Sequence, residues 1–359
     1  MRFARVTLAW LAIGAILIAA VFALMRTPLV AEPIARRSEA AAIALPRARR
    51  AATENQLQIA FAAGGVGALW GTTGGALVSL KPNGPTLAID PGEGFVAALD
   101  GVAHWDDVVM VLLSSADLAH AGGLSGLRRA SWLSGRKTLL PVLGPVGAQG
   151  LAAGIDLAAQ SDDAALMVDF GADGLDFSIA TLAARDLELA DGAPRRVFDE
   201  GGLRVTALAI ATAASGPVLA YRIEAGERCV LWAGDAERTE ALARALRGCL
   251  LLAVEAHDPE RLALVHAAAD AAGERRSARA IGAAKRGLTL TQAGQIAGAA
   301  GTALVVLTRL QPAPPNDITA RALEAATRRA GALQVLALRR PLRATIDLAN
   351  GEVSVRQIR

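Results

Sequence analysis

The chain has 359 residues, of which 53% are hydrophobic, 20% charged and 4% aromatic, and its net charge is +3. This apolar content is ample for a core and excludes a chain that is disordered over most of its length. Lysine occurs only at positions 81, 137 and 285, so the basic residues are almost all arginines. An Arg-rich and Ala-rich composition is more typical of a GC-rich genome than of polyanion binding, so we expect no nucleic-acid partner.

The N-terminus contains an uncharged run over residues 6–25, directly after Arg2 and Arg5. About 20 apolar residues suffice to cross the hydrocarbon core, so this run predicts a single transmembrane helix that anchors the chain. A cleaved secretory signal is the alternative, because residues 21–23 loosely match a small-x-small cleavage site. The run is longer than a usual signal segment, which favours the uncleaved anchor.

Arg2 and Arg5 favour a cytoplasmic N-terminus, which would export the remainder of the chain to the periplasmic or extracellular side. Arginines at positions 26, 36 and 37 weaken this charge asymmetry. We therefore predict an anchor or signal at 1–25, a linker rich in Ala, Arg and Pro at 26–55, and a globular domain at 56–359.

Short apolar segments alternate with helical patterns along the globular part. The predicted strands are 57–62, 76–80, 108–113, 205–211, 218–223, 229–232, 250–254 and 303–307. The predicted helices are 122–133, 237–246, 259–272, 291–300 and 318–330. Continuous apolar strands interleaved with helices indicate buried sheets covered by helices. The pair 218–223 and 229–232, joined by a turn-like Glu-Ala-Gly-Glu, indicates an antiparallel hairpin as well, so the sheets are mixed.

The two cysteines, Cys229 and Cys249, leave two possibilities open. They can pair in an oxidising compartment, but their spacing does not demand a bridge, and we expect two buried free thiols.

Common catalytic motifs are missing from the sequence. The glycine-rich stretch 64–71 follows a strand but lacks both the Gly-Lys-Ser/Thr ending of a phosphate loop and the dinucleotide-binding spacing. No serine lies in a G-x-S-x-G elbow, and neither C-x-x-C nor H-E-x-x-H occurs. These observations exclude the simplest nucleotide-binding, serine-hydrolase and zinc-protease interpretations.

Four segments, in order, resemble the metallo-β-lactamase fold, and within it the ribonuclease Z and arylsulfatase-like branch. They are AIDPGEG at 88–94, VLLSSADLAHAGGL at 111–124, the pair YRI and VLWAGDA at 221–223 and 230–236, and the stretch 291–310. These segments resemble the family's strand ending in Asp-Cys-Gly-x-Gly, its Thr-His-x-His-x-Asp-His followed by Gly-Gly-Leu, its hairpin ending in Gly-Asp-Thr, and its final helix and strand ending in Leu-Thr-His. The resemblance covers residues 56–359 and implies a four-layer αββα sandwich.

The resemblance also implies a site in which His and Asp side chains at strand ends hold two metal ions, usually zinc, and a bridging hydroxide attacks the substrate. Two ligands are retained, as His120 and Asp235, and Asp117 stands where the family has a histidine, so these three residues are the vestigial metal-binding candidates. The other four ligand positions are substituted, and they are Ser115, Ala119, Thr212 (within a residue or so) and Arg309. A further histidine that contacts substrate in the ribonuclease Z branch falls near Gly287 and is absent.

The substitutions predict that the two-zinc site is lost. The first metal would find two carboxylates, two hydroxyls and no imidazole, and the second would face Arg309, whose guanidinium does not deprotonate. We expect Arg309 to pair with Asp117 or Asp235 in place of the metal charge, with His120 as a hydrogen-bonding member of the network. The alternative is an eroded pocket from which Arg309 turns to solvent.

The sequence thus favours a membrane-tethered, catalytically degenerate member of this fold that needs no cofactor and acts by binding an unknown protein or small molecule. The alternative is a hydrolase of phosphoester, sulfate-ester or related bonds. It would use one weakly held zinc or other divalent ion on Asp117, His120 and Asp235.

Overall fold

The computed structural model describes residues 14, 17–21, 23–24, 27, 30–34, 36–37, 56–63, 66–67, 71–72, 74–81, 84–102, 104–171, 174–190, 193–213, 216–236, 240–283 and 287–358. The chain divides into two compact units, residues 1–51 and 52–359. No helix within the described ranges combines the length and apolarity needed to cross a membrane. The predicted anchor at 1–25 falls largely outside those ranges.

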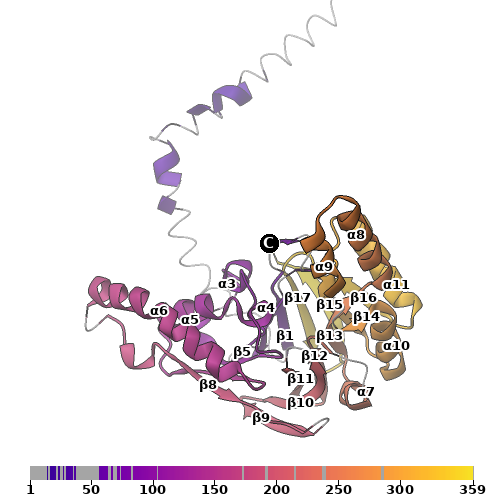
Figure 1. The fold of residues 1–359 in the computed structure, drawn as a ribbon. Helices are drawn as coiled ribbons and strands as arrows, with labels where there is room; N and C mark the ends of the chain where they lie inside the picture. Colours follow the sequence, from indigo (N-terminus) through magenta and orange to yellow (C-terminus); the bar gives the residue numbers. More distant parts are fainter. Residues whose placement is uncertain are drawn as a thin grey trace, which may run out of the picture. The chain divides into compact units, whose positions relative to one another are not determined.

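Two eight-stranded sheets form the middle of the second unit (Figure 1). The first sheet runs in the order β18 (Val353–Gln357), β17 (Leu342–Asp347), β1 (Gln56–Phe61), β4 (Ala76–Lys81), β5 (Thr86–Ile89), β6 (Val108–Leu112), β7 (Leu140–Gly144) and β8 (Leu182–Asp186). The second runs in the order β16 (Gln334–Ala337), β15 (Leu304–Gln311), β13 (Leu251–His257), β12 (Arg228–Ala233), β11 (Gly216–Ala225), β10 (Leu203–Ala213) and β9 (Pro194–Glu200). Short strand β14 (Leu288–Thr289) pairs with β13, and β2 (Val66–Gly67) pairs with β3 (Gly71–Thr72).

The central strands bury both faces, and their residues alternate between two layers of core. In β1, Leu57, Ile59 and Phe61 enter the core between the sheets, whereas Ala60 enters the core beneath the helices of the first sheet. The same alternation holds in β15, and it follows from the two-residue period of a strand. Strands buried on both faces explain why the sequence shows continuous apolar runs.

Helices cover the outer face of each sheet and complete four layers (Figure 1). The helices on the side of the first sheet are α3 (Phe95–Ala98), α4 (Leu118–Ala121), α5 (Leu124–Leu133) and α6 (Ala148–Phe170). Those on the side of the second are α7 (Glu240–Leu246), α8 (Pro259–Ala271), α9 (Arg275–Ala283), α10 (Leu290–Ala300) and α11 (Asp317–Arg329), while η2 (Trp105–Asp107) and η3 (Phe177–Ile179) are single 3₁₀ turns. The four-layer αββα sandwich is therefore as predicted.

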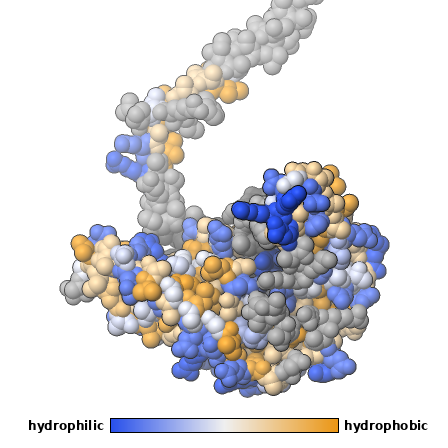
Figure 2. Space-filling model, viewed as in Figure 1, coloured by the Kyte–Doolittle hydropathy of each residue, from blue (hydrophilic) through white to orange (hydrophobic). Residues whose placement is uncertain are grey.

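The predicted strands and helices of the domain are all present, with ends shifted by a few residues, and β11 and β12 form the predicted antiparallel hairpin. The longest described helix, α6, was not predicted. Its apolar residues do not form one clear stripe, and Leu157, Met167 and Val168 are exposed. Apolar residues are accordingly visible on the face of the molecule that includes α5 and α6 (Figure 2).

A buried arginine fixes α5 against α6. Arg128 is 1% exposed, and its guanidinium donates to Asp156 at 2.7 Å and to Asp163 at 2.9 and 2.5 Å. Asp156 also accepts from the backbone N–H of Leu182, which ties both helices to β8. A buried charge needs such partners, and here three elements share them.

The prediction of two free thiols was wrong, because Cys229 and Cys249 form a disulfide. The reason is tertiary. Parallel pairing of β12 with β13 brings the N–H of Leu250 onto the carbonyl of Cys229 at 3.0 Å, which sets the neighbouring Cys249 beside Cys229 with the Cα atoms 4.6 Å apart. That separation is within the range that a disulfide requires.

Candidate functional site: a buried ion network at the strand ends

The site lies where parallel strands of the two sheets end. Strands β5 to β8 are parallel in the first sheet, and β12, β13 and β15 are parallel in the second. Ligand sites of α/β sheets form at the carboxyl ends of such strands. The residues that these ends carry are Asp90 after β5, Ser114 to Asp117 after β6, Asp235 after β12, Glu255 within β13 and Arg309 within β15.

Asp90 is a buried structural carboxylate. It accepts from the N–H and the hydroxyl of Ser114 and from the indole N–H of Trp232, each at 2.6 Å. Its backbone has φ = 46°, a left-handed conformation that Asp tolerates better than most residues. Although these hydrogen bonds favour the carboxylate, burial dominates and raises the pKa of Asp90. The contacts join β5, β6 and β12 directly beneath the loop that follows β6.

Asp117 organises that loop. It is the N-cap of α4, and its Oδ1 accepts from the backbone N–H of His120 at 3.1 Å. Its Oδ2 accepts from the hydroxyl of Ser115 at 3.1 Å. Both carboxylate oxygens are therefore engaged within their own loop, in the manner of a helix cap.

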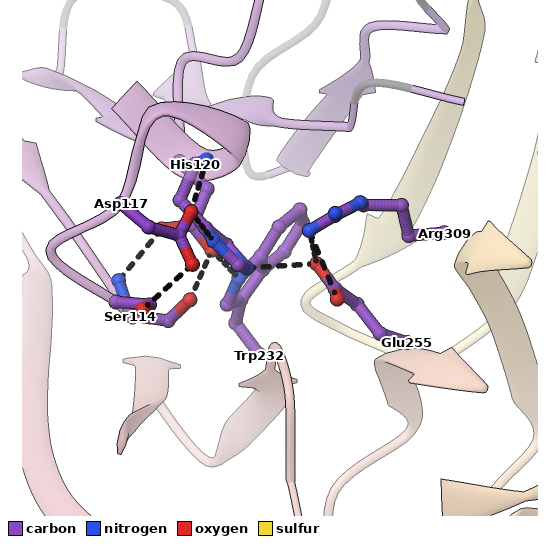
Figure 3. A network of polar contacts seen from close by, with 8 residues as sticks. Ser114, Asp117, His120, Trp232, Glu255 and Arg309 are labelled. Carbon is purple, nitrogen blue, oxygen red and sulfur yellow. Dashed lines mark hydrogen bonds and ion pairs between the residues drawn. The ribbon is translucent and has the colours of Figure 1, made fainter. Parts of the chain in front are cut away.

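His120 bridges two carboxylates from different sheets (Figure 3). Its Nδ1 lies 2.7 Å from Asp117 Oδ1 and its Nε2 lies 2.9 Å from Glu255 Oε1, and the ring is 2% exposed. A carboxylate accepts hydrogen bonds, so each ring nitrogen must carry a proton and His120 is an imidazolium. Burial would lower the pKa of His120, but the charge of Glu255 and the hydrogen bond to Asp117 raise it well above its usual value.

Arg309 enters the network through Glu255 (Figure 3). Its guanidinium lies 3.3 and 3.4 Å from the two oxygens of Glu255, and the two side chains are 14% and 10% exposed. The charge of Glu255 is the main cause of the raised pKa of Arg309, and Asp117 and Asp235 contribute to it as well. Arg309 thus turns inward, as predicted, but its ion pair is with Glu255 rather than with the Asp117 or Asp235 that the sequence suggested.

Opposite charges keep the carboxylates ionised despite their burial. Burial would raise the pKa of Glu255, but Arg309 and then His120 lower it. Burial would likewise raise the pKa of Asp117, and the hydrogen bond and charge of His120 lower it far below its usual range. The network is therefore an alternation of fixed charges, with a cation next to each of these carboxylates.

The remaining predicted ligand positions surround this network. Ser115 is buried, Ala119 is half-buried in α4, and Asp235 is 4% exposed in the turn after β12. Gly287 lies beside Asp235, because a Cβ built on it would stand 3.3 Å from Asp235 Oδ1. Thr212 pairs with Pro217 in the β10–β11 hairpin, and its side chain lies outside the described part of the structure.

The other three histidines belong to other elements than α4. His104 precedes η2, His266 is exposed on α8, and His257 is the last residue of β13. Asp258 caps α8 by accepting from the N–H groups of Glu260 and Arg261, as predicted.

The residues at the site do not fit two zinc ions. Zinc in proteins is held by deprotonated thiolates, neutral imidazoles and carboxylates, and an imidazolium has no lone pair to offer. His120 supplies the imidazole of the site, and both of its nitrogens are committed to carboxylates. Among the residues that the structure describes, no group of three or more His, Cys, Asp or Glu side chains is arranged to hold a metal ion.

Glu255 is the residue of this site that sequence reasoning missed. A signal was available, because Glu255 interrupts the otherwise uncharged run of β13, LLAVEAH, whose residues are all buried. A carboxylate in such a strand requires a partner cation. The sequence does not identify the cation that pairs with Glu255, because Arg309 is 54 residues and His120 is 135 residues away from it along the chain.

Comparison with known proteins identifies the fold of this chain. No protein-family model matches the chain, and no curated protein does. Among solved structures, the metallo-β-lactamase fold protein YhfI from Bacillus subtilis is 15% identical at a TM-score of 0.52, covering 84% of this chain and 100% of that one. The short form of human tRNase Z is 16% identical at a TM-score of 0.52, and the match covers 78% of this chain and 96% of that one. A diphosphatase of the PhnP family is 12% identical at a TM-score of 0.50, and the match covers 80% of this chain and 96% of that one. The chain therefore has the metallo-β-lactamase fold, as the four sequence segments implied.

Proposed function

We propose that this protein is a catalytically degenerate member of the metallo-β-lactamase fold that acts by binding rather than by hydrolysis. The observation that carries the proposal is the geometry of His120, whose two ring nitrogens each lie within hydrogen-bond distance of a carboxylate. An ion network of Asp117, His120, Glu255 and Arg309 lies at the strand ends, where the family resemblance implies metal ligands. In this chain, Arg309 and the His120 imidazolium take over the neutralising role of the metal charge.

We further propose that the domain is tethered to a membrane by residues 1–25 and lies on the exported side. The apolar run and the preceding arginines support the tether and its orientation. The disulfide between Cys229 and Cys249 supports export, because structural disulfides persist in oxidising compartments and are rare in the cytosol.

Elemental analysis of the purified full chain tests the loss of the metal centre. After dialysis against metal-free buffer and then against micromolar zinc, we expect less than about 0.2 zinc per chain, against two in a complete site. About two metal ions per chain that survive dialysis would overturn the proposal. A single tightly held ion that disappears in Asp235→Asn would instead favour a hydrolase with a reduced metal site.

A restoration variant provides the positive control. Replacing Ser115, Asp117, Thr212 and Arg309 by His and Ala119 by Asp rebuilds the family's ligand set on this backbone. We expect this variant to gain zinc, whereas the matched variant that retains Arg309 gains less, because a guanidinium remains at the second metal position.

A further inference from the structure

A cavity lies at the ends of other strands, and the residues of the ion network are not among its described lining residues. Its volume is about 350 Å³, and it lies at the carboxyl ends of β7 and β8, against the β10–β11 hairpin. Val146 follows β7, and Leu187 and Leu189 follow β8, while Leu219 belongs to β11. Cavities of 300 to 1,000 Å³ that are mainly apolar are typical of small-molecule sites.

The cavity is a solvent-open continuation of the core between the sheets. Three of its wall residues, Leu187, Ala209 and Leu219, are at most 7% exposed and belong to that core. Val146, in contrast, is 52% exposed at the mouth. An apolar molecule that enters would extend the core and remove this surface from water, which is favourable in proportion to the apolar area buried.

The cavity adjoins the ion network through the backbone. The N–H of Leu219 donates to the carbonyl of Ser114 at 2.9 Å, and Ser114 is the residue that holds Asp90. On the other side, a Cβ built on Gly147, next to Val146, would stand 3.3 Å from the Cβ of Ala116 in the same loop. The walls of the cavity therefore pack against residues 114–116, the segment that leads to Asp117 and His120.

The charge of the lining selects the ligand. The other lining residues are apolar, namely Val146, Leu187, Leu189, Ala190, Ala209, Pro217 and Leu219. Glu188 is the ionisable residue among the lining residues that the structure describes, and it is exposed, so this described lining holds a carboxylate and no cation. An anionic ligand would meet repulsion from Glu188 without an opposing charge.

We propose that this cavity binds a small apolar molecule without negative charge, with a bulk of about two to three aromatic rings. The size follows from the volume, since a cavity of about 150 Å³ accommodates one benzene. The inference rests on the proposed binding role, because it names the class of ligand that the degenerate site would take.

A matched pair of fluorescent probes tests the cavity in the full chain. N-phenyl-1-naphthylamine is neutral, and 8-anilinonaphthalene-1-sulfonate has the same two ring systems with a sulfonate added. With the probe held at low concentration and titrated with protein, we expect a Kd of about 0.2 mM for the neutral probe, from the ligand efficiency of drug-sized molecules applied to its roughly 17 non-hydrogen atoms. We expect the sulfonate to bind about three- to five-fold more weakly, and Glu188→Gln to remove most of this difference.

Plugging variants locate the binding. Val146→Trp and Ala190→Trp each fill the cavity from an exposed position and should weaken binding of the neutral probe at least ten-fold. Val168→Trp is the matched control, because Val168 is an exposed valine on α6, outside the cavity lining, and it should leave the Kd within two-fold of wild type.

Undiminished binding by both plugged variants, with unchanged circular dichroism, would overturn the assignment, as would absence of any binding by the wild type. Tighter binding of the sulfonate would refute the charge preference. These outcomes are independent of the zinc content, so failure of the cavity assignment is distinguishable from failure of the proposed loss of the metal centre.

Discussion

Removing the guanidinium of Arg309 is the most direct test of the idea that a cation stabilises the strand ends. In Arg309→Met, the methionine fills much of the same space, but Glu255 loses one of the two cations that neutralise it. Glu255 would then remain a buried carboxylate with only His120 beside it. We expect the variant to fold and to be less stable than the wild type.

The magnitude follows from the geometry of the pair. Removing one partner of a buried ion pair typically costs 3 to 5 kcal/mol. Here the N–O distances of 3.3 and 3.4 Å are longer than those of a strong charge-assisted bond, and Glu255 keeps its contact to His120 at 2.9 Å. Both considerations reduce the expected loss to about 2.5 kcal/mol in the free energy of unfolding.

Urea denaturation of the wild type, Arg309→Met, Glu255→Gln and the double variant measures both the loss and the coupling. We expect the double variant to be more stable than the sum of the two single losses predicts, by about 1 to 2 kcal/mol, because neither partner is then left alone. Additive losses, or a wild-type unfolding free energy in Arg309→Met, would refute the reasoning.

Three further outcomes follow from the described contacts. Arg128→Met should cost about 3 kcal/mol of unfolding free energy, because it leaves two carboxylates on α6 without their buried cation. The control Arg129→Met breaks a half-exposed pair with Asp162 and should cost less than about 1 kcal/mol. Equal losses of the two variants in urea titrations would contradict this expectation. Reducing the disulfide between Cys229 and Cys249 should cost about 3 kcal/mol, as expected for a closed loop of this length, and a urea midpoint unchanged by dithiothreitol would count against it. The raised pKa of His120 stabilises the fold fully below its unfolded value of about 6.5, and this stabilisation is lost as the pH rises towards the folded pKa. Relative to His120→Gln, the wild type should therefore lose up to about 1.4 kcal/mol per pH unit above neutrality, and parallel pH profiles of the two proteins would show that His120 is not the group responsible.

The sequence determined the architecture because the information for it is local. Two-residue alternation and continuous apolar runs marked the strands, and four ordered segments around Asp90, His120, Asp235 and Arg309 indicated the fold. Helix α6 was missed because its apolar residues face several directions, so that no stripe of helical period stands out. The prediction that imidazole ligands are lost rests on residue identity alone, at the positions that match the family's motifs.

Partner choice was decided by the tertiary structure. Residue order alone does not predict that Arg309 pairs with Glu255 or that Cys229 pairs with Cys249, because each pairing depends on the register of neighbouring parallel strands. Sequence alone therefore established that a cation stands where a metal ligand was expected. Only the packing of the two sheets decided which buried carboxylate it neutralises, because desolvated charges pair with whatever opposite charge the fold brings within a few ångströms.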